Sequence, residues 1–109
     1  MLDRRSDARV DLEVPCKVWH PRAMRFLPGT THDLSRNGAS VTLRSGLPLQ
    51  PGERIRVGLP AQAGAIVRSG SDLIEGTVVR TSTSEGRVLV AISFDGAAQD
   101  QAEAAARRA

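Results

Sequence analysis

The residues best suited to chemistry lie in one short stretch, residues 31–38. Asp33 and Ser35 are two positions apart, so on an extended backbone both side chains point to one face. The Asp33 carboxylate accepts two N–H donors, and the Ser35 hydroxyl donates to an oxygen or accepts from a nitrogen. Asn37 and Gly38 form a turn dipeptide, in which the glycine is expected to adopt a positive φ and to allow close approach of another group. This combination suits a guanine edge beside a phosphate, but it equally suits a strand end stabilised by Asx and Ser/Thr turns.

A second group of candidate ligand-binding residues lies near the start of the sequence. Residues 1–9 are polar and include Arg4, Arg5 and Arg9. A guanidinium group is a planar fork that binds phosphate or the O6/N7 edge of guanine in a bidentate manner, which lysine cannot do. A polar segment at a terminus is expected to be mobile unless something holds it, so these side chains would need another element to position them.

The composition limits the classes of protein to consider. A chain of 109 residues forms one domain with a modest core. The net charge is +3, and the pI of about 10.4 reflects a small excess of arginine, not a strong field. Cys16 is the only cysteine, so there is no intrachain disulfide, and we interpret it as a small core residue. No apolar run approaches the roughly 20 residues that span a bilayer, so we expect a cytoplasmic protein without membrane insertion.

The elements that must position the candidate residues are read from hydrophobic periodicity. Alternating apolar and polar residues predict strands over residues 10–18, 30–35, 39–44, 54–60, 73–80 and 88–94. Pro15 suggests an edge position or a bulge in the first strand. Residues 20–29 and 45–52 are expected to be loops, with a short strand near Phe26, and residues 65–74 a hairpin. Short strands with Gly and Pro turns and no crossover helix predict an all-β antiparallel barrel or sandwich.

Residues 96–109 are rich in alanine and are predicted to form a helix. The segment contains no large apolar residue to hold it against a barrel. An isolated helix of this length is marginal in water, so we expect it to fray. The chain is thus divided into an arm (1–9), a barrel (10–95) and a C-terminal helix (96–109).

Taken together, the two motifs resemble the signature of the PilZ domain family. That family pairs Arg-x-x-x-Arg, here Arg5 to Arg9, with [Asp/Asn]-x-Ser-x-x-Gly, here Asp33 to Gly38. The resemblance extends over nearly the whole chain and implies a six-stranded antiparallel β-barrel. The chain departs from the family in lacking the aromatic residue often seen near Val79.

The resemblance implies that the protein binds cyclic di-GMP, a bacterial second messenger. Arg5 and Arg9 would then hold phosphate oxygens and the guanine O6/N7 edge, and Asp33 the guanine N1 and N2 hydrogens. Ser35 would make a polar contact, and Gly38 would allow close backbone approach to the ligand. Arg4 would stack on a purine, which favours an intercalated pair of ligand molecules over a single one. The arm would become ordered around the ligand and relay the signal to an unidentified partner protein.

Other classes of function are less compatible with these residues. We expect neither an enzyme nor a metal site or cofactor, because the sequence has one cysteine and two histidines without suggestive spacing. A triad of Ser35, His32 and Asp33 is excluded if strand neighbours face opposite ways, and His32 is interpreted as a solvated surface residue. A basic barrel binding nucleic acid, suggested by outward Arg54 and Arg56, is disfavoured by the 3% aromatic content. A ligand-independent protein-interaction module is the other alternative.

Overall fold

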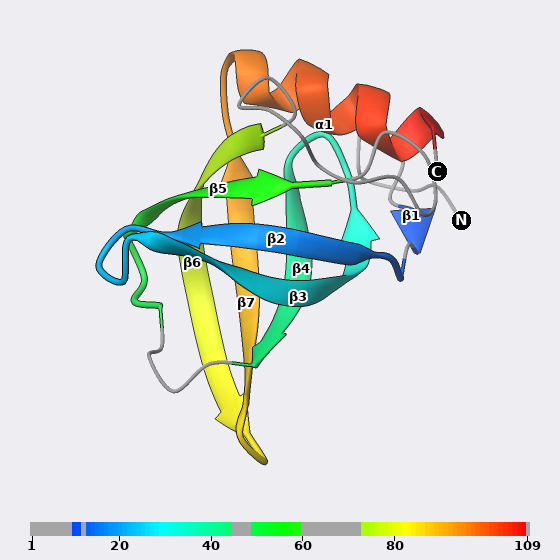
Figure 1. Cartoon of the computed structure of the whole chain (residues 1–109). Coiled ribbons are helices and arrows are strands. Elements are labelled where there is room, and N and C mark those ends of the chain that lie inside the picture. Colours follow the sequence, from blue (N-terminus) through cyan, green and yellow to red (C-terminus); the bar gives the residue numbers. More distant parts are fainter. Residues whose placement is uncertain (1–9, 12, 45–48, 60–72, 109) are drawn as a thin grey trace.

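The strands of the molecule close into an antiparallel barrel, with one helix across an end (Figure 1). This computed structural model describes residues 10–11, 13–44, 49–59 and 73–108. The elements are β1 (Val10–Asp11), β2 (Pro15–His20), β3 (Arg25–Leu34), β4 (Gly38–Arg44), β5 (Arg54–Gly58), β6 (Leu73–Ser84), β7 (Arg87–Phe94) and α1 (Ala97–Arg108). Strands pair in the order β3-β2-β5-β6-β7-β4, and β4 pairs again with β3, which closes a six-stranded ring. The predicted six-stranded antiparallel barrel with a C-terminal helix is therefore confirmed.

The barrel is filled by the inward-facing residues that the period-two patterns predict. On β4 and β5 the buried apolar residues alternate with outward polar ones, as expected for a sheet with one solvated face. The buried strand residues include Cys16, Val18, Leu27, Leu34, Ala39, Val41, Leu43, Ile55, Val57, Ile74, Val78, Val88, Val90, Ile92 and Phe94. Cys16 is a core residue as predicted, and desolvation by burial raises the pKa of its thiol to about 12.

The first predicted strand is divided in two. β1 pairs with the Leu34 end of β3, and β2 begins at Pro15 and pairs with the other end of β3. Proline is tolerated as the first residue of a strand, where its missing N–H costs little. The junction is held by the buried Thr31, whose Oγ1 accepts the Val14 N–H at 3.2 Å and donates to the Val14 carbonyl at 3.3 Å.

β3 is longer than predicted, because it runs through Pro28 and Gly29, which we had expected to lie in a loop. Pro28 lies opposite Lys17 on β2. A Cβ atom at Gly29 would lie 2.6 Å from Leu43 Cδ2 and 2.8 Å from the Thr42 carbonyl oxygen. The glycine thus allows β4 to approach closely, and tertiary contact overrides the local preference for a loop.

The β6–β7 hairpin is also more extended than the sequence suggested. Its turn consists of Glu85 and Gly86, both with positive φ (53° and 76°), as a two-residue type I′ turn requires. A bulge between Val78 and Arg80 leaves Val79 exposed on the outer surface. The other predicted hairpin, residues 65–74, lies mostly outside the described residues.

Helix α1 packs on the barrel through small side chains. Ala98, Ala102 and Ala105 are buried, and the helix contacts β3, β6 and β7. The expectation that nothing holds the helix to the barrel is therefore wrong, because alanines let the helix backbone approach the barrel closely enough to be covered. Fraying of its end stays a prediction. Within the described residues, no helix is long and apolar enough to cross a membrane.

An Ala102→Glu substitution tests this packing. Ala102 is 0% exposed, so the new carboxylate would be buried or would force the helix away, at a cost of about 2 kcal/mol in unfolding free energy. Chemical denaturation measures the loss. The control Gln101→Glu adds the same charge at an exposed neighbouring position and should change stability little. Equal stability of both variants would show that α1 is not docked.

Candidate ligand-binding site

A bulge in β3 determines how the candidate carboxylate is presented. Thr31 pairs with Val41 and Asp33 with Ser40, so His32 is an extra residue that the strand register pairs with no residue of β4. The bulge changes the direction in which the side chains of the strand point. As a result, both His32 and Asp33 are partly exposed and line one pocket. The argument that neighbouring strand residues face opposite ways therefore fails for His32 and Asp33, although the next residue, Leu34, is buried in the core.

The pocket beside Asp33 lies on the outer surface of the barrel. It has a volume of about 580 Å³ and is open to solvent. Its walls come from β3, β4, β6, β7 and the β6–β7 turn. The lining residues are His32, Asp33, Ser40, Thr42, Ser82, Ser84, Glu85, Arg87 and Leu89. Hydroxyl groups, two carboxylates and a guanidinium group next to an apolar side chain make this a polar site suited to a nucleotide-sized ligand.

Ser35 has a different environment from Asp33. The chain leaves the strand after Leu34, and Ser35 is only 2% exposed. Its Oγ accepts the N–H groups of Asn37 and Gly38, both at 3.3 Å, and lies 3.3 Å from the Gly38 carbonyl. This is the Ser/Thr turn that the sequence left open, so the hydroxyl shapes the motif. A direct contact between Ser35 and a ligand stays a prediction.

Gly38 is needed for the close packing of β4 against β7, and not for an unusual backbone conformation. Its φ is not positive, contrary to our expectation. A Cβ atom at this position would lie 2.3 Å from the Ile92 carbonyl oxygen of β7. The close approach predicted for Gly38 is thus made by the neighbouring strand, and contact with a ligand at this position stays a prediction. The neighbouring Asn37 carbonyl accepts the Phe94 N–H at 2.8 Å, which ties the turn to β7.

The middle of the motif also bonds to the C-terminal helix. Arg36 Nη1 lies 2.7 Å from Asp100 Oδ1 and 3.3 Å from Glu103 Oε1. The hydrogen bond to Asp100 contributes most to raising the pKa of Arg36 above its usual value. Gln99 Nε2 donates to Asn37 Oδ1 at 3.3 Å. No local sequence signal indicated these contacts, because the partners are more than 60 residues apart.

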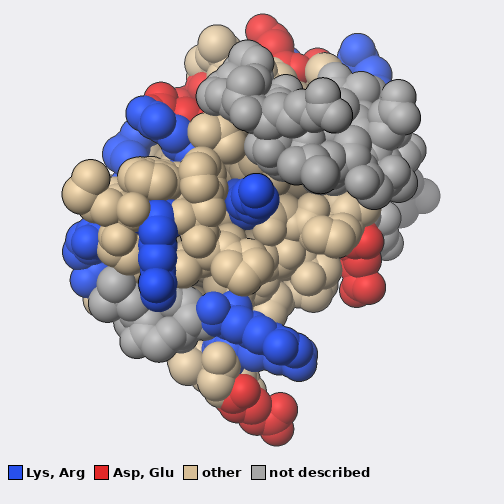
Figure 2. Space-filling view, in the orientation of Figure 1, with Lys and Arg blue, Asp and Glu red and all other residues tan. Residues whose placement is uncertain are grey.

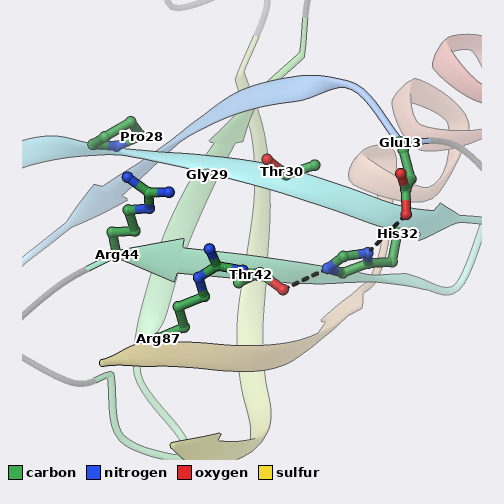
Figure 3. Close-up of a pocket in the computed structure, with 8 residues that line it drawn as sticks. All are labelled: Glu13, Pro28, Gly29, Thr30, His32, Thr42, Arg44 and Arg87. Carbon is green, nitrogen blue, oxygen red and sulfur yellow. Dashed lines mark hydrogen bonds and ion pairs between the residues drawn. The ribbon is translucent and has the colours of Figure 1, made fainter. Parts of the chain in front are cut away.

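A second pocket adjoins the first along the outer face of β3 and β4 (Figure 3). It has a volume of about 480 Å³ and is lined by Glu13, Pro28, Gly29, Thr30, His32, Thr42, Arg44 and Arg87. His32 Nε2 hydrogen-bonds to Thr42 Oγ1, and its Nδ1 lies 3.6 Å from Glu13 Oε2. His32 is a partly exposed surface residue, and in addition to what we predicted these contacts position it between the two pockets.

The arginines of the first motif, Arg4, Arg5 and Arg9, lie outside the described residues, as does Leu12. The strand that follows them is described, however. β1 pairs with β3 so that Val10 lies opposite Leu34 and Asp11 opposite Asp33. The backbone immediately after Arg9 therefore runs beside the candidate carboxylate.

Charge is distributed unevenly over the surface near the site. Figure 2 shows several basic side chains on the face that β2 and β3 present, whereas the acidic side chains in this view lie toward its edges. The charge of some basic residues is compensated by a neighbour: Arg54 forms an ion pair with Glu75 at 3.0 Å. Arg54 also donates a hydrogen bond to the Thr77 hydroxyl at 3.0 Å. The surplus of positive charge favours an anionic ligand.

The chain is a small closed barrel with a polar pocket on its outer wall and a short N-terminal strand paired with β3. The model of the PilZ domain matches residues 3–108, and the chain belongs to this family. No curated protein matches the chain at a significant level.

Solved structures with the same fold are PilZ-domain proteins. The inhibitor of motility MotI/DgrA of Bacillus subtilis has a TM-score of 0.67 and 20% identity, over 94% of this chain and 48% of that one. The chain thus spans about half the length of that protein. The PilZ domain of Escherichia coli YcgR with c-di-GMP has a TM-score of 0.59 and 16% identity, over 92% and 86%. The PilZ domain of CeSA from a cellulose-synthesizing bacterium has a TM-score of 0.56 and 18% identity, over 92% of each chain.

Proposed function

We propose that this chain is a receptor for cyclic di-GMP that binds the dinucleotide between its N-terminal arm and the outer pocket at Asp33. The observation that carries the proposal is the pairing of β1 with β3, which brings the chain past Asp33 directly after the arginine motif. Family membership supports the proposal, as does the likeness to the YcgR domain, whose structure contains c-di-GMP. A cytoplasmic location and the absence of a resident cofactor are part of the same proposal.

The chemical roles follow from the groups present. The Asp33 carboxylate accepts from guanine N1–H and N2–H, and Arg5 and Arg9 supply forks for phosphate and for the guanine O6/N7 edge. Arg4 stacks on a purine face, which favours two intercalated ligand molecules per chain. Ser35 and Gly38 act chiefly by giving the turn after Asp33 its shape. The role is binding and not catalysis.

Signal relay is the second part of the proposal. Ligand binding orders residues 1–9, and this ordering costs part of the binding free energy. The ordered arm then offers a new surface to a partner protein. The contacts of Arg36 with Asp100 and Glu103 give the site a second connection, to α1, whose position would respond to a change in the turn. The partner's identity is not part of the proposal.

The alternatives draw less support from the structure. The hypothesis that Arg54 and Arg56 bind nucleic acid has less support, because Arg54 already bonds to Glu75 and Thr77. The hypothesis of a ligand-independent interaction module does not account for the polar pocket beside Asp33.

Calorimetric titration of the purified protein with cyclic di-GMP tests the proposal. We expect saturable binding at one or two molecules per chain and a raised melting temperature, since a ligand that binds only the native state stabilises it. Asp33→Ala should weaken binding at least about tenfold, because it removes charge-assisted hydrogen bonds. Glu75→Ala, which removes a carboxylate that lines neither pocket, is the control. Absence of both heat and a melting shift at saturating dinucleotide would refute the proposal.

A further inference from the structure

Two arginines of the second pocket lie directly opposite each other on neighbouring strands. Arg44 is the last residue of β4 and Arg87 the first of β7, and the two are cross-strand partners. Both are exposed. Like charges at facing positions of an antiparallel pair are unfavourable unless something compensates them.

No carboxylate within the described part of the chain forms an ion pair with either arginine. Some other exposed arginines do have such partners: Arg22 pairs with Glu53 at 3.0 Å and Arg54 with Glu75 at 3.0 Å. Arg44 and Arg87 thus place two positive charges side by side, with no direct ion-pair partner among the described residues.

The pair lies in a pocket that can hold a counter-ion. Figure 3 shows both side chains extending from β4 and β7 toward β3, with Thr42 between Arg87 and His32. The hydroxyls of Thr30 and Thr42 line the same pocket of about 480 Å³. Its one carboxylate, Glu13, is at the opposite end, where it faces His32 at 3.6 Å, so it does not oppose an anion beside the arginines.

We propose that Arg44 and Arg87, with the hydroxyl of Thr42, form a binding site for a phosphoryl group. Two guanidinium forks match the double negative charge and the several oxygens of a phosphate, whereas a carboxylate would leave one positive charge uncompensated. The Thr42 hydroxyl supplies a further donor when His32 Nε2–H donates the hydrogen bond between these two side chains. The site is separate from the motif residues: Ser40, which faces Asp33, and Arg44 are four residues apart on β4, or about 14 Å.

The phosphoryl group has two possible sources. It is either a free phosphate ion or a phosphate of a nucleotide that extends along the groove from Asp33. The second source is physically accessible because the two pockets share His32, Thr42 and Arg87 and thus adjoin. Only this second source rests on the proposed function.

The test is a titration of the ¹⁵N-labelled full chain with sodium phosphate, followed by NMR, against sodium chloride at matched ionic strength. We expect saturable shifts of the Arg44 and Arg87 side-chain Nε–Hε signals and the Thr42 amide. R44Q/R87Q should weaken phosphate binding at least tenfold, while R54Q/R56Q removes the same charge on β5 and should leave it within twofold. R44K/R87K keeps the charge but not the fork, and should weaken it severalfold.

Parallel titration with cyclic di-GMP identifies the source. If R44Q/R87Q loses at least tenfold in dinucleotide affinity and phosphate competes with the dinucleotide, the nucleotide supplies the phosphoryl group. If dinucleotide affinity stays within threefold and both ligands bind together, or if no dinucleotide binds while phosphate saturates the site, free phosphate is the ligand. The inference is overturned if phosphate shifts do not saturate, follow ionic strength alone, or are equal in R44Q/R87Q and R54Q/R56Q.

Discussion

Gly38→Ala is expected to destabilise the fold by about 3 kcal/mol, because the new methyl group has no space. A Cβ atom would lie 2.3 Å from the Ile92 carbonyl oxygen, which is backbone and cannot rotate away. Either β4 separates from β7 or the turn after Asp33 moves. Since the backbone φ of Gly38 is not positive, the cost comes from this contact and not from strain. Urea denaturation without ligand measures it.

Ser40→Ala is the matched control for this prediction. Ser40 lies on the same strand but faces the outer pocket, so truncation of its side chain should change stability by less than about 0.5 kcal/mol. The family signature alone would predict that Gly38→Ala impairs ligand binding and leaves the fold intact. A fully stable Gly38→Ala protein would therefore contradict the packing described here.

Arg9→Ala and Arg5→Ala are each expected to reduce cyclic di-GMP affinity by roughly 100-fold while leaving the barrel folded. Removing a guanidinium that makes charge-assisted bonds to phosphate costs about 2–3 kcal/mol, and every 1.4 kcal/mol is a factor of ten. Both residues precede β1, whose pairing brings the chain beside Asp33. Calorimetry gives the affinity, and thermal denaturation without ligand confirms the fold.

Arg56→Ala controls for the loss of one positive charge. Arg56 is exposed on β5, which pairs with β2 and β6 and contributes no residue to either pocket. It should bind with unchanged affinity at fixed ionic strength. If Arg5→Ala, Arg9→Ala and Arg56→Ala weakened binding equally, the interaction would be a general attraction between charges, and the proposed site would be wrong.

What the sequence determined by itself is the local pattern of this protein. The period-two alternation predicted which residues of β2, β4 and β5 face the core, because burial of one sheet face constrains every second position. The alanine content predicted α1, and the paired motifs indicated the PilZ family.

The tertiary structure decided features that depend on which strands become neighbours. The bulge at His32, the contact of Gly38 with Ile92 and the path of β3 through Pro28 follow from strand register, which local propensity does not specify. The docking of α1 depends on a surface that only the closed barrel creates. The facing of Arg44 and Arg87 joins residues 43 positions apart, so this pair of like charges becomes visible only when β4 pairs with β7.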